Sequence, residues 1–526
     1  MLIGGKEYTI EERLFAASGN IAALNYCKHE YVEYNGAFYF YDAFYTKLLQ
    51  SINGRKICIG EIPYLGVLYL EQFLRSNGLK IVTFNNFDLD LLEIDKMIRN
   101  CMVPIVAIST TFFTSPIPII RMVQHIKKNN RDIKIIVGGA YIYNQYLSLA
   151  WDKLILELKL MASDFYICDP QGEKTLYEII NEILGNAKCD ANNLIRMADA
   201  NKIFQTKRID VEHNDININI VRVDQIEDRL IRSPFNIRTS RGCPNRCMFC
   251  NYPVRNPKWE VQDIEKVFIQ IKALNEDRRI NSVVFIDDSF NVPLSRFKEI
   301  CRYMVSLGYI KTWYSYFRLD YCDEETAALM KASGCGGVFL GIESADNTIL
   351  KYMNKQTTIE IYERSLSYLN KYEIPTFGYF IVGFPGETKE SVNRTIEFIN
   401  RNRLTFYSCN LWFAEKETAI FASKDKYGLE GAGFDWSHNT MDSIEASELM
   451  GYMYINVKDS VYVPGENFSF WGVPYLIDKG LTLSDVKSLL QYTRDFIVLS
   501  RFHEGSTNET KDKVMGKIKH VLEKVQ

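Results

Sequence analysis

Two long stretches of the chain alternate short apolar runs with segments of helical periodicity. In the first stretch, runs rich in β-branched residues predict strands, and apolar residues spaced three and four apart predict the helices between them. The predicted strands are residues 56–60, 80–84, 104–109, 134–137 and 164–168, and the predicted helices are 67–76, 89–100, 117–128 and 173–184. This alternation is typical of a parallel, doubly wound sheet, which binds ligands at the carboxyl ends of its strands. The residues expected there are Pro63, Gly66, Ser109, Thr110, Gly138, Gly139, Gly172 and Glu173.

The same alternation returns near residue 235 and predicts a second domain. Its predicted strands are residues 235–239, 282–287, 312–317, 337–341, 376–382 and 406–413, and its predicted helices are 262–274, 294–307, 324–332, 359–371 and 389–402. Six strand–helix units are too few for a closed eight-stranded barrel, so we expect a partial (β/α)₆ barrel with its site at the carboxyl ends of the strands. Three more helices are predicted at residues 443–459, 483–496 and 508–525.

These patterns predict an α/β protein in five parts. Residues 1–50 form an N-terminal extension, in which 31–45 is predicted as a strand or hairpin. Residues 51–186 form a doubly wound, Rossmann-like domain, and the polar residues 187–233 form a linker, in which residues 215–221 are a candidate edge hairpin. Residues 234–415 form the partial barrel, and 416–526 form a mostly helical region that caps it or binds substrate.

Composition narrows the class of protein. The 526 residues are 47% hydrophobic and 24% charged, as in ordinary soluble globular proteins of two or three domains. The net charge of -3 gives no electrostatic basis for a nucleic-acid partner. No apolar run reaches the about 18 residues that a membrane span needs, and the N-terminus lacks a signal-peptide pattern. Twelve cysteines without that signal favour a reducing, cytoplasmic location.

Three cysteines follow the first strand of the second domain at C-x₃-C-x₂-C spacing. They are Cys243, Cys247 and Cys250, in the run RGCPNRCMFC. With 12 cysteines in 526 residues, chance would produce such a triplet about 0.006 times. Thiolates on one short loop can hold three irons of a cubane cluster and leave the fourth iron open to another ligand. The alternatives are a zinc knuckle that lacks a ligand, or three unrelated buried thiols.

This loop resembles the signature of the radical S-adenosylmethionine (SAM) superfamily, with Phe249 at the position whose backbone contacts adenine. The resemblance implies a 4Fe-4S cluster on the three cysteines, whose open iron binds the methionyl amine and carboxylate of SAM. It implies reductive cleavage of SAM to a 5′-deoxyadenosyl radical. It also implies an electron donor such as flavodoxin or ferredoxin.

Later motifs resemble the SAM-binding strands of the superfamily over residues 236–413. Asp287 and Asp288 stand where the family receives the methionyl amine, although the usual glycine–glutamate run is missing and a helix cap is the alternative. Arg318 would pair with the SAM carboxylate, or else with Asp320.

The fourth and fifth strands carry further likenesses. Glu343 and Ser344, in GGVFLGIES, would reach the ribose hydroxyls or the methionyl group. Ile381 would flank the adenine, and Gly383 would allow a tight turn. The downstream Met353-Asn354-Lys355 run also matches the family.

The first domain resembles the cobalamin-binding domain that often precedes a radical SAM barrel, over about residues 55–184. The likeness rests on the Pro63-to-Gly66 turn, the Gly138-Gly139 turn and the Gly172-Glu173 pair. A nicotinamide dinucleotide is not expected, because no G-x-G-x-x-G follows the first strand. The D-x-H-x-x-G motif is also absent, and neither His29 nor His125 stands in its context, so cobalamin would bind without a histidine from this domain. The alternative is a domain that keeps the fold and has lost the ligand.

The C-terminal loop of residues 427–442 resembles regions of radical SAM enzymes that act on natural products or peptides, including the phosphinate P-methyltransferase type. Trp436 and His438 would line the substrate pocket, with His438 as a general base. A structural loop is the alternative, and residues 468–471 are predicted as a pocket wall or as core. Cys335 and Cys409, near strand ends, would donate a hydrogen atom or else be inert buried thiols.

The leading interpretation is a cobalamin-dependent radical SAM methyltransferase that modifies an unactivated carbon or phosphorus of a small molecule or peptide. One alternative is a cobalamin-independent peptide epimerase or cyclase. A tRNA methylthiotransferase is disfavoured because no second cysteine triplet occurs. A non-catalytic cluster or corrin sensor is the alternative outside catalysis.

Overall fold

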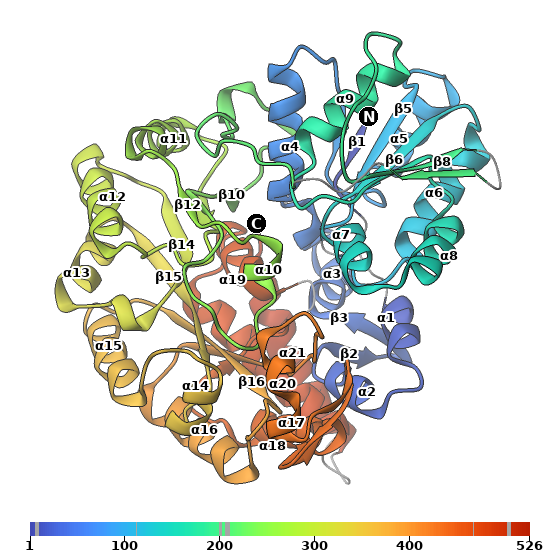
Figure 1. Cartoon of the computed structure of the whole chain (residues 1–526). Coiled ribbons are helices and arrows are strands. Elements are labelled where there is room, and N and C mark those ends of the chain that lie inside the picture. Colours follow the sequence, from blue (N-terminus) through green and yellow to red (C-terminus); the bar gives the residue numbers. More distant parts are fainter. Residues whose placement is uncertain (6–9, 112, 199–201, 206–210, 466–467, 502–506) are drawn as a thin grey trace. The chain divides into compact units, whose positions relative to one another are not determined.

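The computed structural model describes the whole chain apart from residues 6–9, 112, 199–201, 206–210, 466–467 and 502–506. The chain forms two compact units, which can be followed by colour in Figure 1. The first unit comprises Met1–Glu12 and Gly60–Arg232, and the second comprises Arg13–Ile59 and Ser233–Gln526. Each unit is built on a seven-stranded sheet, so the predicted α/β class is confirmed.

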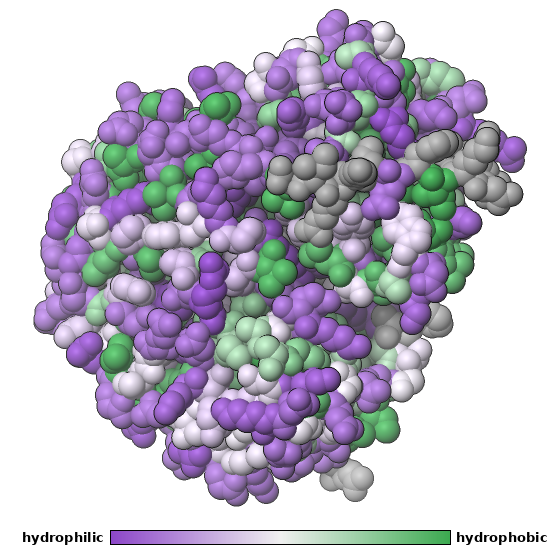
Figure 2. Space-filling view, viewed as in Figure 1, coloured by the Kyte–Doolittle hydropathy of each residue, from purple (hydrophilic) through white to green (hydrophobic). Residues whose placement is uncertain are grey.

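On the face shown in Figure 2, hydrophilic side chains predominate and hydrophobic ones are scattered among them. Within the described residues, no helix combines the length and the apolar character needed to cross a bilayer.

The sheet of the first unit has the order β4-β1-β5-β6-β7-β8-β9. Its five parallel strands are β1 (Leu2–Ile3), β4 (Thr83–Phe84), β5 (Ile105–Ser109), β6 (Lys134–Gly138) and β7 (Phe165–Ile167). Numbered along the chain these strands run 2-1-3-4-5, which is a doubly wound order with its switch point between β1 and β5. An antiparallel hairpin of β8 (Leu194–Ala198) and β9 (Lys202–Gln205) extends the sheet at β7.

Three sequence predictions for the first unit are wrong. Residues 56–60 form no strand, and η1 (Ile59–Glu61) is a 3₁₀ turn; β1 takes the place expected for that strand. Ile57 and Ile59 are buried, and a short buried run cannot be told from a strand by its apolar content alone. The polar segment 187–233, expected as a linker, supplies β8 and β9, while residues 215–219 form a turn and not a hairpin.

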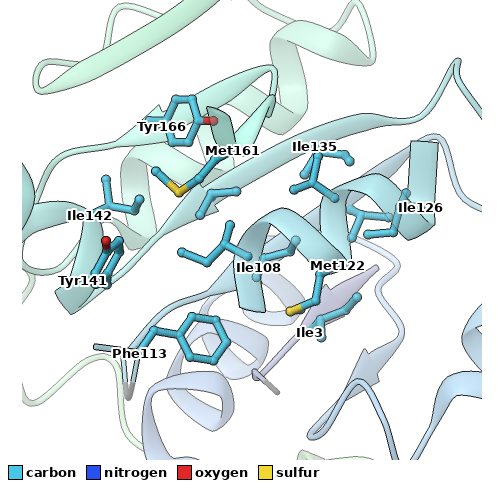
Figure 3. Close-up of a cluster of buried hydrophobic side chains, with 14 of the residues drawn as sticks. Ile3, Ile108, Phe113, Met122, Ile126, Ile135, Tyr141, Ile142, Met161 and Tyr166 are labelled. Atoms are coloured by element: carbon cyan, nitrogen blue, oxygen red, sulfur yellow. The ribbon is translucent and has the colours of Figure 1, made fainter. Parts of the chain in front are cut away.

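Helices cover both faces of this sheet because neighbouring strand residues point to opposite sides. On one face, Ile3, Ile108 and Ile135 pack against Met122 and Ile126 of α6 (Figure 3). That core includes side chains of α5 (Leu91–Arg99), α6 (Ile117–Asn129), α7 (Ala140–Ser148) and α8 (Trp151–Met161), of which α7 and α8 were not predicted. On the other face, residues of α4 (Leu65–Ser76) and α9 (Glu173–Ile183) pack against Leu2, Ala107 and Ile136.

The second unit contains the partial barrel that the sequence predicted. All the strands of this barrel are parallel and follow chain order. They are β10 (Phe235–Ile237), β13 (Ser282–Phe285), β14 (Thr312–Phe317), β15 (Cys335–Glu343), β16 (Thr376–Val382), β17 (Phe406–Leu411) and a short β21 (Val461–Tyr462). The helices between them lie outside the strands in Figure 1 and are α11 (Ile264–Glu276), α12 (Leu294–Leu307), α13 (Glu324–Ala332), α15 (Ile359–Lys371) and α16 (Lys389–Asn402). Strand β21 is an addition to the six predicted strands.

Segments far apart in sequence complete this unit. The N-terminal part supplies α2 (Ile21–Cys27), the hairpin of β2 (Tyr31–Tyr34) and β3 (Ala37–Phe40), and α3 (Tyr41–Ile52). The C-terminal part supplies α18 (Ser443–Asn456), α19 (Ser469–Asp478), α20 (Leu483–Arg501) and α21 (Asn508–Leu522). It also contains a small antiparallel sheet, β18 (Glu430–Ala432), β19 (Asp435–His438) and β20 (Met441–Asp442), where a loop was expected. The hydroxyl of Tyr462 donates to Glu30 at 2.8 Å, which ties the two parts together.

The central position of β1 leads to a stability prediction. Ile3 is 0% exposed, and Ile3→Ala is expected to destabilise the first unit by about 2–5 kcal/mol because it opens a cavity between β4 and β5. Faster hydrogen–deuterium exchange in β5 would report the loss. Leu92→Ala on α5, where the side chain is 88% exposed, is the matched control. Equal exchange in the two variants would contradict the central position of β1.

Candidate active site

A cavity of about 520 Å³ lies at the carboxyl halves of the strands in the second unit. Mainly alternate residues of neighbouring strands face it, because successive side chains of a strand point to opposite faces. These residues are Tyr316 and Arg318 from β14 and its end, Phe339, Gly341 and Glu343 from β15, Tyr379 and Ile381 from β16, and Asn410 from β17. The parallel register sets Ile381 beside Asn410 and Gly341 beside Tyr379.

The three cysteines stand on one loop at the edge of this cavity. Cys243, Cys247 and Cys250 are free thiols, and all three line the cavity. The loop is closed at its base by the antiparallel pair β11 (Ser240–Arg241) and β12 (Glu260–Val261), and α10 (Tyr252–Arg255) follows it. Gly242 has a φ of 83°, and a Cβ there would lie 2.3 Å from the Lys258 carbonyl oxygen. Only glycine fits this position.

Backbone hydrogen bonds hold the cysteine loop against the turn after α14 (Asn347–Tyr352). The Met248 N–H donates to the Met353 carbonyl at 2.9 Å, and the side-chain amide of Asn354 donates to the backbone carbonyl of Arg246 at 2.8 Å. The Ile420 N–H donates to the Met248 carbonyl at 3.1 Å. The Met353-Asn354 pair therefore has a structural task, which is to fix the conformation of the loop.

The thiols suit a cluster better than a single ion. Burial raises the pKa of Cys247 and raises that of Cys250 to about 12, so thiolates there need the positive charge of a metal. In the part of the chain that the structure describes, no three His, Cys, Asp or Glu side chains lie close enough to hold one metal ion. Three thiols that converge on one cavity fit a cubane, whose ligands bind separate irons.

Glu343 occupies a strained position at the end of β15. Its φ of 67° lies in the left-handed region, and the register with β16 shifts between Gly341 and Glu343. The Lys355 ammonium, only 6% exposed, donates to the Gly341 carbonyl at 2.7 Å and to Glu343 Oε1 at 3.3 Å. Strain of this kind persists where the surrounding structure imposes it, and it is frequent at functional sites.

Arg318 lines the cavity and is also engaged with protein groups. Its Nε donates to Asp320 Oδ1 at 3.0 Å and its Nη2 donates to Asp320 Oδ2 at 2.9 Å, so the alternative partner foreseen for it is present. Nη2 also donates to the Lys355 carbonyl at 2.9 Å. Arg318 therefore positions the turn that carries Lys355.

Of the acidic pair after β13, only Asp288 faces the cavity. Asp288 is exposed to the cavity, and partial desolvation there raises its pKa to about 7 although Tyr252 hydrogen-bonds to it. Asp287 is buried and accepts hydrogen bonds from the Thr239 N–H at 2.8 Å and the Ser240 hydroxyl at 2.6 Å. Asp287 thus holds the start of the cysteine loop, and the sequence did not separate the two roles.

Ser344 and Gly383 lie outside the cavity lining. Ser344 is buried, and its hydroxyl has no hydrogen-bond partner among the described residues. A Cβ on Gly383 would lie 2.5 Å from the ring of Trp436, so Gly383 serves close packing.

His438 is held inside the protein and does not line the cavity. It is 8% exposed and stacks on Trp436 with ring centroids 5.1 Å apart. Its Nε2 lies 3.1 Å from the Gly383 carbonyl and its Nδ1 lies 3.0 Å from the Thr440 hydroxyl. With both ring nitrogens engaged, His438 has no nitrogen free to act as a general base. Burial also lowers its pKa.

Cys335 and Cys409 are buried and face away from the cavity lining. Burial raises the pKa of both thiols, to about 12 for Cys409. The alternation of side chains along β17 explains the position of Cys409, since Asn410 points into the cavity and the preceding Cys409 points away from it. The structure therefore favours the inert interpretation of both cysteines over hydrogen-atom donation.

Several lining residues were not predicted as site residues. Strand alternation could have predicted Tyr379, which is two residues before Ile381 and so faces the same side of the sheet. It could also have predicted Asn410, which follows Cys409 and so faces the opposite side. Lys355 lay in a matched motif without an assigned role. Phe470 of α19 falls in the segment expected as pocket wall or core, and it is wall. Other residues of this kind include Tyr252, Tyr316, Phe339, Trp412, Phe413 and Glu415.

In the first unit, most predicted ligand-binding residues meet at the ends of β5 and β6. The Thr110 hydroxyl donates to the Gly138 carbonyl at 2.8 Å, and a Cβ on Gly139 (φ 107°) would lie 2.9 Å from the Thr110 nitrogen. The Ser109 hydroxyl lies 3.2 Å from the Thr111 hydroxyl, and a Cβ on Gly66 would lie 3.5 Å from that same Thr111 hydroxyl.

The other three predicted residues of the first unit have structural surroundings. Pro63 precedes α4, and Gly172 (φ 75°) is the cap at the start of α9. The Glu173 carboxylate accepts from the Asn214 amide at 2.8 Å. Glu173 is therefore engaged by the segment that follows β9.

Comparison with known proteins identifies the class. Residues 237–399 match the model of the Radical SAM superfamily, which is the region from β10 to α16 and includes the cysteine loop. The chain therefore carries a radical SAM domain, as the cysteine motif predicted, and its similarity to methyltransferases indicates an enzyme.

The more specific similarities are to methyltransferases. An uncharacterized methyltransferase of Pyrococcus horikoshii is 26% identical over 346 residues, covering 64% of this chain and 73% of that protein. The bacteriochlorophyllide d C-12(1)-methyltransferase of Chlorobaculum tepidum is 33% identical over 206 residues, which cover 38% of this chain and 44% of that protein. The structure of the radical SAM methyltransferase TsrM from Kitasatospora setae, with cobalamin and a 4Fe-4S cluster bound, has the same fold. It aligns with a TM-score of 0.60 and 15% identity over 87% of this chain and 96% of TsrM.

A buried carboxyl beside the cavity leads to a pH prediction. Glu387 is 1% exposed and accepts from the Gly383 N–H at 2.6 Å, and burial raises its pKa to about 8. A raised carboxyl pKa stabilises the fold fully below the ordinary value near 4.5, and this stabilisation is lost as the pH rises through about 8. The Glu387→Gln variant cannot ionise at this position. Its free energy of unfolding is therefore expected to fall by a few kcal/mol less than that of the native protein between pH 5 and 9.

Denaturant midpoints across this pH range test the expectation. Glu390→Gln is the matched control, because Glu390 lies exposed in the first turn of α16. If the Glu387 variant and the control follow the same pH dependence, Glu387 is not the group responsible.

Proposed function

We propose that the protein is a cobalamin-dependent radical SAM methyltransferase that methylates an unactivated carbon or phosphorus of a small molecule or peptide. The observation that carries the proposal is the convergence of three free thiols, Arg318 and Glu343 on one cavity at the strand ends. The methyltransferase relatives, and the fold shared with TsrM across both units, support the same reaction class.

In the second unit, Cys243, Cys247 and Cys250 would hold three irons of a 4Fe-4S cluster. Asp288 would accept a hydrogen bond from the methionyl ammonium of SAM, since a carboxylate suits that donor. Glu343 would receive ribose hydroxyls or the methionyl group, and Ile381 would flank the adenine. Lys355 keeps Glu343 in place, and the aromatic residues around the cavity exclude water from it.

In the first unit, cobalamin would bind at the carboxyl ends of β1, β5 and β6. The switch point of a doubly wound sheet is where such folds bind ligands. Gly66 leaves room for a bulky group, Gly139 allows the ends of β5 and β6 to pack closely, and the hydroxyls of Ser109 and Thr111 are polar partners for the ligand. His125 is held by Asp95 at 2.6 Å, which agrees with binding that uses no histidine of this sheet as a cobalt ligand.

When bound, the cluster supplies the electron that cleaves SAM to methionine and a 5′-deoxyadenosyl radical, and cobalamin supplies a transferable methyl group. The chain itself binds and orients these groups. The substrate would lie in the same cavity as SAM, because the radical must form beside the atom that it attacks.

The rival functions have less support. A peptide epimerase would use a thiol as hydrogen-atom donor, and neither Cys335 nor Cys409 lines the cavity. A cluster or corrin sensor would need no polar groups for ribose and methionine, yet Glu343, Arg318 and Lys355 are arranged beside the thiols.

The central test is anaerobic reconstitution with iron, sulfide and hydroxocobalamin, followed by addition of SAM and a strong reductant. We expect the protein to retain both cluster and corrinoid absorbance and to form 5′-deoxyadenosine. Cobalamin should be required for methyl transfer, traced with SAM carrying a deuterated methyl group. Deoxyadenosine formation without any retained cobalamin would favour the epimerase or cyclase, and no SAM cleavage at all would favour the sensor.

Gly242→Ala tests the role of the cysteine loop. A side chain at this position would collide with the Lys258 carbonyl, so the loop must shift and the variant should retain several-fold less iron after reconstitution. Gly308→Ala is the matched control, with a similar φ of 64° and no atom within 4 Å of the added Cβ. Full iron content in the Gly242 variant would show that the loop conformation does not matter for the cluster.

A further inference from the structure

Four aromatic rings form one wall of the cavity in the second unit. Tyr316, Phe339 and Tyr379 come from three adjacent strands. Phe470 of α19 contacts all three, with ring centroids 4.7 Å from Tyr316 and 5.3 Å from both Phe339 and Tyr379. This aromatic wall is suited to stacking or edge contacts with another flat ring.

The charged and the aromatic residues of the cavity are distributed unequally along the sheet. Arg318 and Glu343 come from β14 and β15, close to Lys355 and the cysteine loop. The β17 side supplies Asn410, Trp412 and Phe413, followed by Glu415, whose carboxylate pairs with Arg255 at 3.4 Å. If SAM takes the charged side, the β17 side and the aromatic wall are left for the substrate.

Asn410 is the polar residue that β17 itself adds to this lining, and a distant helix fixes its amide. The Tyr26 hydroxyl, on α2, donates to Asn410 Oδ1 at 3.0 Å. Among the described residues the Asn410 side chain makes no other hydrogen bond, although it lines the cavity and is half-buried. Its Nδ2 is therefore a donor left for a molecule inside the cavity. A donor left without a partner in a cavity is unfavourable, so the site should select a ligand that supplies an acceptor.

We propose that this part of the cavity binds a flat aromatic substrate with a carbonyl or carboxylate oxygen at its edge. The ring contacts the wall of Tyr316, Phe339, Tyr379 and Phe470, and the oxygen accepts a hydrogen bond from Asn410 Nδ2. SAM has to share the about 520 Å³, so we expect a substrate of one or two fused rings. Asn410 is a specificity-determining residue, and Tyr26 is a positioning residue that acts through it. This inference names the substrate class for the proposed function and rests on it.

A matched pair of probes tests the inference by binding alone. Indole-3-acetamide and 3-ethylindole share a ring system and differ in the acceptor group. Dissociation constants would be measured by ligand-observed NMR on the anaerobically reconstituted protein with SAM present and no reductant, so that no turnover occurs. We expect indole-3-acetamide to bind about five- to thirtyfold more tightly.

Two variants locate the preference. Asn410→Leu, of similar size, should bind both probes equally, and Tyr26→Phe should reduce the preference because the amide can then rotate. Asn100→Leu, at an exposed position after α5, should retain the preference of the native protein. Circular dichroism of each variant confirms that the fold is intact, and Tyr26→Phe, which removes one hydroxyl, provides a second variant if Asn410→Leu does not fold.

Three results would overturn the proposal. The first is equal binding of both probes by the native protein, and the second is binding of neither. The third is a preference for tryptamine, which presents a donor in place of the acceptor. None of these results depends on SAM cleavage. A protein that selects indole-3-acetamide but never cleaves SAM would refute the proposed function and leave the recognition by Asn410 standing.

Discussion

The turn formed by Met353, Asn354 and Lys355 holds the site together. Its first two residues form hydrogen bonds with the backbone of the cysteine loop at Met248 and Arg246. Its third residue donates to the Gly341 carbonyl and to Glu343 on β15, and its carbonyl accepts from Arg318 at the end of β14. One short turn therefore sets the distance between the thiols and two strands. A displacement there would move the metal ligands and the polar groups of the cavity together.

Unfavourable features concentrate around this turn. Glu343, Asn354 and Gln356 all have φ values in the left-handed region, at 67°, 53° and 57°, although none is a glycine. Lys355 is buried with its charge, and burial alone would lower its pKa; the neighbouring Glu343 more than offsets that effect, so the pKa of Lys355 is raised. Strain and buried charge are retained only where packing imposes them, and here they coincide with the cavity that bears the cysteines. The scaffold around them is regular parallel sheet, which can carry that cost.

The two units also show how distant parts of the chain complete each sheet. The first unit takes its central strand from the first residues and its hairpin edge from residues after 190. The second unit takes α2 and α3 from residues before 60 and α19 from the C-terminal part. Through Tyr26 and Phe470, these two additions touch residues of the proposed substrate side of the cavity. Substrate recognition in this protein would thus depend on segments outside the region that matches the superfamily.

Local patterns in the sequence determined much of the second unit. The bounds of α12, α13, α15 and α16 agree with the predicted ranges, because each helix buries one stripe of a repeating pattern. The cysteine spacing predicted the superfamily, since ligands on one short loop are a local property. Tertiary structure decided the rest. Local periodicity does not show which distant segment forms a given strand of a sheet. Residues 56–60 were therefore predicted as the strand that β1 in fact supplies. Local periodicity also does not show what surrounds a side chain: His438, Cys335 and Cys409 have suitable chemistry but are enclosed. Asn410 and Phe470 face the cavity because register and long-range packing put them there.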